Sequence, residues 1–342
     1  MKMKKIAAAV CAAALAVSMT GCADTSWAVK YENVTIPIGM YNFFLVSNAY
    51  SVNQMAASNA SASSDVWSQT VSGTSAATWA MNGALDNCKQ FAVIEKLCAD
   101  KKITITASNK TEVANYASSE YSQSSGMLTK NGISQVSMER FYDDYYYLRS
   151  SLFNAYDKAG KFPIAASATT DYYAKNYVHV KQIFVAKEDL SKSTPVPYTG
   201  AKLAAQKKKA NAAFKAAKAD PANFEKYVKL YNEDPGMKKD PNGYTFSQAS
   251  ASNYDTQFTS LGFSLKDGAV GMSESDMGYF IELKVKIDPA KMSKTDKAAV
   301  EQTLKATKFT DMLKDIVKKA KFEQNNAAFD KFSPKGIDLT AS

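Results

Sequence analysis

The sequence predicts an α+β protein in which a mainly helical domain is interrupted by a compact α/β domain. A β-rich run, 177–185, opens a series of helices and strands that closes at a final strand, 278–286. Helical periodicity precedes this series and resumes after Ser293. We therefore expect two domains and a leader: a signal peptide at 1–21, a discontinuous helical domain at 22–170 and 290–342, and an inserted α/β domain at 171–289.

The composition of the 342 residues excludes several classes of function. Hydrophobic residues make up 46% and charged residues 22%, as in ordinary globular domains. A single histidine, His179, excludes metal cages built from several histidines. Arg140 and Arg149 are the only arginines among 42 basic residues, whereas base and phosphate recognition favour the guanidinium group. We expect neither a nucleic-acid partner nor a metal ion.

The N-terminus is typical of a secretory signal. Three lysines precede an apolar run at 6–17, and small residues lead to Gly21 and Cys22. Twelve helical residues rise ~18 Å, less than the ~30 Å hydrocarbon core of a membrane. The end of the run resembles a bacterial lipobox, in which the Cys22 thiol takes a diacylglycerol; the alternative is an ordinary signal peptide with a chance cysteine. We expect a protein anchored by lipid at Cys22 on the extracytoplasmic face of the cell membrane.

Cleavage of the signal peptide leaves two cysteines besides the anchor. It also removes three lysines and no acid, so the net charge falls from +9 to +6. Cys88 and Cys98 are ten residues apart, which is ~15 Å along a helix and too far for a disulfide. We expect them to be buried free thiols on one apolar helical face, formed by Met81, Ala84, Cys88, Phe91, Ile94 and Cys98.

The remaining N-terminal elements follow from periodicity. Alternation over 27–31 and 34–36 predicts a small hairpin, and the Ser/Ala-rich stretch 56–76 predicts a loop or a frayed helix end. A stronger helix begins near Ser137. Its core stripe is expected to comprise Met138, Phe141, Tyr145, Leu148 and Leu152. Three further tyrosines spread around this helix and are candidates for a surface that contacts clients: Tyr142, Tyr146 and Tyr147.

The second half of the chain alternates strands with helices. After the strand at 177–185, helices are expected at 200–219 and 223–231, with lysines 207–209 on a solvated face. From Ser293, a predicted N-cap, an amphipathic helix resumes. Its apolar face needs a partner, and we expect that face to pack on the N-terminal helices through Phe309, Leu313, Ile316 and Ala320.

Five segments of the inserted domain resemble the parvulin (PpiC-type) peptidyl-prolyl isomerases. In chain order they are V-H-V-K-Q-I-F-V (178–185), N-F-E-K-Y-V-K-L-Y-N-E-D (223–234), N-G-Y-T-F (242–246), T-Q-F-T-S-L-G-F-S-L-K-D-G-A-V-G (256–271) and M-G-Y-F-I-E-L (277–283). Together with the lipobox and the helical N-terminal region, the layout resembles the PrsA/SurA-type extracytoplasmic foldases. The resemblance implies a parvulin domain inserted in a helical chaperone domain.

The same resemblance implies which residues form the proline pocket. Phe258 corresponds to the phenylalanine on the pocket floor, and Asp234 to the family's cysteine or aspartate. The two pocket histidines of the family correspond here to Gln182 and Phe280, so their hydrogen-bonded pair cannot form. The complete set of expected pocket residues is Gln182, Phe184, Asp234, Tyr254, Phe258, Met277 and Phe280.

His179 is not expected to replace the missing histidine. Side chains alternate along a strand, so His179 points away from the face that Gln182 and Phe184 share. Prolyl isomerisation requires only a twist about the amide, with a barrier of ~18–20 kcal/mol, and so needs neither a nucleophile nor a cofactor.

We therefore predict a membrane-anchored foldase or holdase that binds unfolded or partly folded secreted polypeptides. Its parvulin domain is expected to have weak or absent isomerase activity and no confident catalytic residue. Two alternatives stay open: an active prolyl isomerase, and a non-catalytic envelope lipoprotein that binds another ligand. A cis-to-trans exchange assay separates the first alternative, and a small ligand that raises the melting temperature would favour the second.

Overall fold

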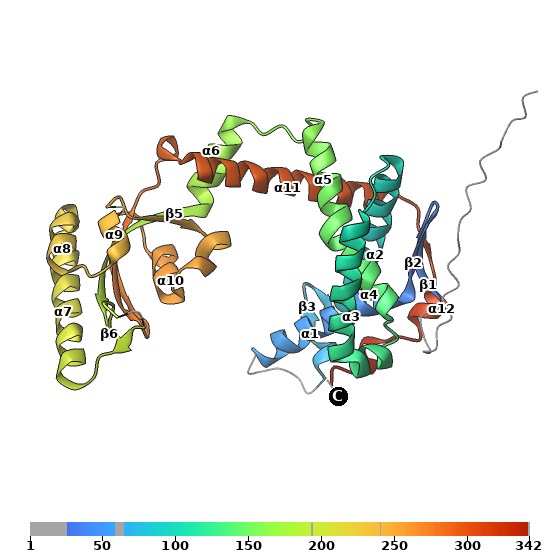
Figure 1. The fold of residues 1–342 in the computed structure, drawn as a ribbon, viewed down its shortest axis with the longest axis horizontal. Helices are drawn as coiled ribbons and strands as arrows, with labels where there is room; N and C mark the ends of the chain where they lie inside the picture. Colours follow the sequence, from blue (N-terminus) through green and yellow to red (C-terminus); the bar gives the residue numbers. More distant parts are fainter. Residues whose placement is uncertain (1–25, 59–64, 193, 240, 341–342) are drawn as a thin grey trace, which may run out of the picture. The chain divides into compact units, whose positions relative to one another are not determined.

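The computed structural model describes residues 26–58, 65–192, 194–239 and 241–340. The chain divides into two compact units (Figure 1). The helical unit contains the described residues up to Phe162 together with those from Ala306 onward, and the sheet unit spans Pro163–Lys305. The predicted signal peptide and Cys22 lie outside the described residues.

The helical unit contains the following elements: β1 Trp27–Tyr31, β2 Val34–Pro37, α1 Ile38–Ala57, β3 Thr70–Val71, β4 Thr74–Ser75, α2 Ala76–Asp100, α3 Ala107–Lys130, α4 Gln135–Tyr142, a π-helix Asp143–Leu148, α5 Arg149–Lys158, the end of α11 Lys294–Lys319, β11 Glu323–Gln324 and α12 Asn326–Phe329.

The sheet unit contains α6 Ala166–Asn176, β5 Tyr177–Ala186, β6 Glu188–Asp189, β7 Val196–Pro197, α7 Gly200–Ala219, α8 Phe224–Tyr231, α9 Pro235–Lys239, β8 Tyr244–Ser247, α10 Thr256–Ser264, β9 Val270–Glu274, β10 Gly278–Val285 and the start of α11.

The hairpin predicted near residue 30 is confirmed, and its apolar residues belong to a buried cluster of the helical unit. Strands β1 and β2 pair antiparallel, and β11 adds a third strand from the C-terminal segment. Val29 and Ile36 of the hairpin pack with Leu45 of α1 and Cys88 of α2 in one buried cluster. Strands that are almost 300 residues apart in the sequence thus meet in one small sheet within this unit.

The predicted helical face around Cys88 is also confirmed. Cys88 and Cys98 are free thiols buried on α2, which is the longest helix before the sheet unit. The stretch 56–76 is more ordered than a loop: α1 runs to Ala57, and two short strands and a 3₁₀ turn precede α2. Residues 59–64 within it lie outside the described part of the chain.

The stripe predicted from Met138 to Leu152 is wrong at its centre. Met138 and Leu152 are buried, but Tyr145 is 54% exposed, and Tyr142 and Asp144 are buried in its place. The cause is the π-helix at 143–148, whose i→i+5 hydrogen bonds add about one residue per turn and shift the buried face.

The C-terminal part of the amphipathic helix after Ser293, from Ala306 onward, packs within the helical unit as predicted. Ser293 caps α11 by accepting a hydrogen bond from the Asp296 backbone N–H. Phe309 and Leu313 are buried with Leu152 and Phe153 of α5, and the rings of Phe309 and Phe153 are 5.5 Å apart. Ile316 is half-buried in the same cluster, and Ala320 follows the last helical residue. The domain boundaries proposed at 170/171 and 289/290 stay predictions.

The sheet unit is an antiparallel four-stranded sheet in the order β8-β5-β10-β9. Helices α7 and α8 cover one face and α10 covers the other (Figure 1). Helices at 200–219 and 224–231 match the predicted ones closely. The prediction that lysines 207–209 share a solvated face is wrong for Lys209. This side chain is half-buried, and its Nζ lies 2.6 Å from Glu233 Oε1, whereas Lys207 and Lys208 are exposed.

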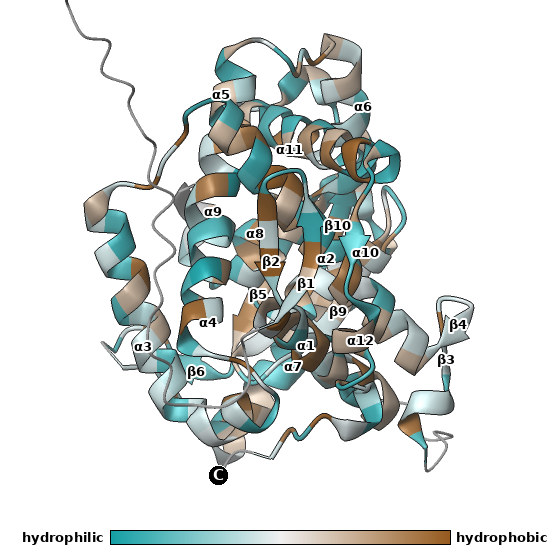
Figure 2. Cartoon of the chain, turned by 90° about the vertical axis from the view of Figure 1, so that its right-hand side faces the viewer, coloured by the Kyte–Doolittle hydropathy of each residue, from teal (hydrophilic) through white to brown (hydrophobic). Residues whose placement is uncertain are grey.

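Both apolar and polar residues occur along the helices, as the hydropathy colours of Figure 2 show. None of the helices in the described part of the chain is both long and apolar enough to cross a membrane.

Candidate functional site

The alternation of side chains along β5 positions the candidate site. Val180 and Phe184 belong to the cluster on the α10 face, whereas Ile183 and Val185 belong to the cluster under α7. Gln182 alternates with them onto the α10 face. His179 lies on the opposite side of β5, where its Nδ1 is 2.8 Å from Thr245 Oγ1. The histidine is therefore outside the site, as the strand period predicts.

A cavity of about 390 Å³ opens on the α10 face of the sheet. It brings together all seven expected residues: Gln182, Phe184, Asp234, Tyr254, Phe258, Met277 and Phe280. Four further residues line it: Leu190, Pro235, Tyr244 and Asp255. The segments that carry the parvulin resemblance therefore meet at one place, and the stretch 247–255 contributes Tyr254 without closing the cavity.

Asp234 is the polar centre of this cavity. Its Oδ2 accepts hydrogen bonds from Gln182 Nε2 at 2.7 Å and from the Tyr244 hydroxyl at 2.6 Å. The backbone N–H groups of Gly236 and Met237 also donate to the carboxylate, at 2.7 and 3.2 Å. Four donors hold this side chain, so Asp234 has a fixed orientation in the wall of the cavity.

The loop that carries Asp234 is fastened to β5 by its neighbours. Asn232 Oδ1 accepts from the Phe184 backbone N–H at 2.8 Å, and from the Asp234 N–H at 3.1 Å. Glu233 Oε2 accepts from the Ala186 N–H at 2.7 Å. The side chains of three consecutive residues thus fix the loop against the strand that carries Gln182.

Aromatic rings form the apolar wall of the cavity. Phe280 packs between Phe184 and Phe258, with ring centroids 5.0 and 5.6 Å away. Tyr244 and Tyr254 each lie 5.7 Å from Phe258. Such pairs add about 0.5–1.5 kcal/mol each beyond the area they bury. The wall is therefore rigid as well as apolar.

Tyr244 was not identified from the sequence, although a signal for it exists. It stands two residues before Phe246 in β8, and a strand places both side chains on the same face. Burial, and then its hydrogen bond to Asp234, raise the Tyr244 pKa far above the usual range. The phenol therefore stays a neutral donor at physiological pH.

One family model matches the chain, that of the PPIC-type PPIASE domain, over residues 166–290. These residues form a PPIC-type peptidyl-prolyl isomerase domain. The match covers 125 of the 342 residues and includes the whole cavity described above. No curated protein matches the chain.

The chain is also similar to solved structures of foldase proteins named PrsA. That of Lactococcus lactis is 17% identical, with 90% of this chain and 100% of that chain covered and a TM-score of 0.34. That of Streptococcus pneumoniae is 16% identical, with 73% of this chain and 88% of that chain covered and a TM-score of 0.35. That of Bacillus subtilis is 20% identical, with 74% of this chain and 91% of that chain covered and a TM-score of 0.27. Likeness at these identities and TM-scores carries no functional argument.

Two side chains that line the cavity of the PPIC-type domain, Gln182 and Phe280, carry no ionisable group. Gln182 does not titrate, and Phe280 presents only an apolar ring, so neither side chain can exchange a proton with a substrate. Within the described ranges no group of three or more His, Cys, Asp or Glu side chains is placed to hold a metal ion. What remains is an apolar slot with a polar edge, suited to a small apolar ring that follows a peptide carbonyl.

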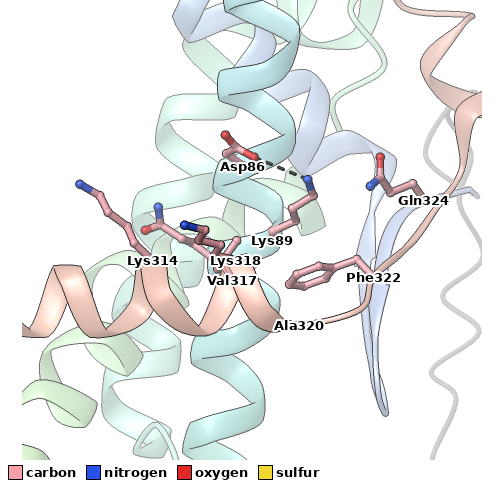
Figure 3. A pocket seen from close by; sticks show the side chains of 9 residues that line it. Asp86, Lys89, Lys314, Val317, Lys318, Ala320, Phe322 and Gln324 are labelled. Carbon is pink, nitrogen blue, oxygen red and sulfur yellow. Dashed lines mark ion pairs between the residues drawn. The ribbon is translucent and has the colours of Figure 1, made fainter.

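A cavity of the helical unit differs in character. It measures about 570 Å³ and lies between α2 and the end of α11 (Figure 3). Lys89 pairs with Asp86 at 3.6 Å there, and Lys314 and Lys318 of α11 also line the cavity. Charged side chains on flexible stems make it a solvated groove, so the cavity of the PPIC-type domain is the better candidate.

Proposed function

We propose that this protein is a membrane-anchored extracytoplasmic foldase or holdase that assists the folding of secreted polypeptides. Its PPIC-type domain would bind prolyl segments and isomerise them weakly or not at all. The observation that carries the proposal is the aromatic slot beside Asp234, which is lined by Gln182 and Phe280. The parvulin resemblance aligns these two residues with the two pocket histidines of the family.

Retention of peptide is favoured by the composition of the slot. Three phenylalanine rings, Phe184, Phe258 and Phe280, surround an open volume, and a buried apolar ring gains about 25 cal/mol per Å² removed from water. Asp234 supplies a fixed acceptor at one edge. These features suit binding of a prolyl ring whether or not turnover follows.

Weak turnover is favoured by the two substitutions. The resemblance to parvulins implies a hydrogen-bonded histidine pair that shapes the site. Here Phe280 fills the second position and Gln182 is held by Asp234 at 2.7 Å. The slot would therefore hold proline without assisting rotation of the amide.

A tyrosine surface on the helical unit is proposed to shield clients. Tyr116, Tyr145 and Tyr146 are 45%, 54% and 49% exposed, and their rings contact one another or the buried Tyr142. The π-helix turns Tyr145 and Tyr146 outward. Amphipathic rings of this kind bury large area at low entropic cost, so they suit exposed apolar segments of many sequences.

The shielding role is tested by suppression of aggregation with residues 23–342. We expect the unchanged chain to delay aggregation of a denatured client, and Tyr145→Ser with Tyr146→Ser to weaken that effect at least two-fold. Leu230→Ser is the matched control, because Leu230 is an exposed apolar residue outside both surfaces. No suppression by the unchanged chain, or an equal loss in the control, would contradict the holdase proposal.

Membrane anchoring is tested separately through Cys22. Cys22→Ser should abolish acylation and move the full chain from the detergent phase to the aqueous phase in a partition experiment. If the variant still partitions with lipid, the lipobox interpretation is wrong and the anchor lies elsewhere.

A further inference from the structure

Two buried polar side chains lie next to each other on neighbouring strands of the sheet, and among the described residues their oxygen atoms lack hydrogen-bond donors. Gln182 of β5 and Glu282 of β10 are directly opposite in the antiparallel register. Gln182 is 6% exposed and Glu282 is 0% exposed. In the described part of the chain, Gln182 Oε1 and both carboxyl oxygens of Glu282 have no hydrogen-bond partner.

The orientation of the Gln182 amide explains why its oxygen lacks a partner. Its Nε2 donates to Asp234 Oδ2 at 2.7 Å, which places the NH₂ group toward the slot. The amide oxygen is thereby left in the interior, where an unmade hydrogen bond costs about 1–3 kcal/mol. Residues directly opposite in such a pair have Cβ atoms about 4.5–5.5 Å apart, within reach of a hydrogen bond between their side chains.

The surroundings of Glu282 are apolar and closely packed. A Cβ on Gly262 of α10 would lie 3.2 Å from Glu282 Oε2, 2.8 Å from the Phe246 ring and 3.3 Å from a Val180 methyl. On β9 the residue opposite Glu282 is Gly271, beside which lie leucines of α10 and the segment after it. An ionised carboxylate in this place would be uncompensated.

Charged groups on the neighbouring elements are directed elsewhere. On β5, Lys181 pairs with Glu225 of α8, and His179 contacts Thr245, both on the opposite face. On β10, the Lys284 ammonium donates to the Phe263 carbonyl at 3.5 Å.

The remaining titratable groups nearby also have partners of their own. On β9, Glu274 pairs with Lys187, and on β8 the Tyr244 hydroxyl donates to Asp234. Before α10, Asp255 caps the helix by accepting from the Gln257 and Phe258 N–H groups. The cause that shifts Glu282 is therefore its burial, which raises its pKa to about 9.

We propose that Glu282 is a positioning residue whose neutral carboxyl donates its O–H to Gln182 Oε1 and so holds the Gln182 amide toward Asp234. One proton then satisfies the amide oxygen and removes the buried charge. A hydrogen-bonded chain runs from Glu282 through Gln182 to Asp234, where Tyr244 joins it. This role rests on the proposed function of the slot, since it concerns the polar edge that a bound peptide would meet.

The proposal predicts the pH at which the polar edge is lost. Below pH ~9 the carboxyl stays protonated and the chain is complete. As pH rises through that value, Gln182 loses its donor and a buried charge appears, so peptide affinity should fall. The Tyr244 pKa lies higher still, so that phenol keeps its proton over the same range.

The test uses residues 23–342 with a proline-containing tetrapeptide as the probe, titrated between pH 7 and pH 10. Wild-type affinity should fall at least five-fold across this range. Glu282→Gln keeps an N–H donor that cannot titrate, so it should keep the pH 7 affinity at pH 10. Glu282→Met offers no donor and should bind weakly throughout, while Glu225→Gln, a matched carboxyl on the outer surface, should follow the wild type.

A spectroscopic titration separates failure of this inference from failure of the proposed function. In the unchanged chain, the side-chain carboxyl signal of Glu282 and the amide NH₂ signals of Gln182 should shift together near pH 9. This result would support the positioning role of Glu282 even if the tetrapeptide bound at no pH. Failure of the tetrapeptide to bind would contradict only the proposed peptide-binding function of the slot. Titration of Glu282 at an ordinary carboxyl pKa, or a Gln182 amide indifferent to it, would overturn the inference.

Discussion

At the scale of single residues, the donors that converge on Asp234 set the polar edge of the slot. They come from three elements: β5, β8 and the start of α9. Because the carboxylate is shared in this way, its removal affects the fold of the domain as well as the binding surface. The stability of an Asp234 variant should therefore be measured before its activity is interpreted.

We predict that Asp234→Ala lowers the free energy of unfolding of the PPIC-type domain by about 2–4 kcal/mol, because several buried donors lose one acceptor. Asp234→Asn keeps an acceptor oxygen and should cost less. Urea denaturation measures both changes, and Asp276→Ala is the control because Asp276 is exposed in the same domain. An effect of Asp234→Ala as small as that of the control would contradict the central role of Asp234.

We also predict that the two buried thiols are inert in the native protein. Burial, then the nearby charges of Asp144 and Glu95, raise the Cys98 pKa to about 12, and burial raises that of Cys88 further. Only the thiolate is nucleophilic, so almost no reactive form exists at pH 8. In residues 23–342, iodoacetamide should modify neither residue until urea unfolds the chain. Rapid modification of the native protein would show that the helical core opens.

At the scale of elements, the sequence predicts those structures whose period is regular. The helix at 200–219 and the strand at 177–185 were expected within one residue of their observed ends, because alanine spacing and β-branched residues are unambiguous there. The stripe through Tyr145 failed because hydrophobic spacing assumes 3.6 residues per turn, and nothing local in D-D-Y-Y-Y-L signals a π-helix. The strand β11 was missed because two residues carry no period at all.

The C-terminal half of α11 gives a prediction at this scale. Phe309 and Leu313 are buried against α5 and α2, so Phe309→Ala or Leu313→Ala should lower the stability of the helical unit by about 2–5 kcal/mol. Lys314→Ala is the control on the same helix, where the side chain is exposed. Thermal unfolding followed by near-ultraviolet dichroism measures the difference. Equal midpoints for all three variants would contradict the packing of the last helix on the N-terminal ones.

At the scale of the whole molecule, most residues that line the candidate site were predicted from the sequence, whereas the pairing of Gln182 with Glu282 was not. All seven residues that the parvulin resemblance implies line one cavity. Leu190, Pro235 and Asp255 were missed because they lie in a turn, at the first residue of α9 and at the N-cap of α10, where spacing does not indicate direction. The pairing of Gln182 with Glu282 was also missed, because register across a sheet is a property of the fold.

We propose that this PPIC-type domain retains a proline slot and has lost most of its turnover. The measurement is cis-to-trans exchange in an X-Pro tetrapeptide, with the unchanged chain, Gln182→His, Phe280→His and the double variant. We predict wild-type activity at least ten-fold below a histidine-bearing parvulin, which corresponds to ~1.4 kcal/mol of barrier. The double variant should gain more than either single variant. Full parvulin-like activity in the unchanged protein, abolished by Phe258→Ala, would contradict the claim and establish an active isomerase.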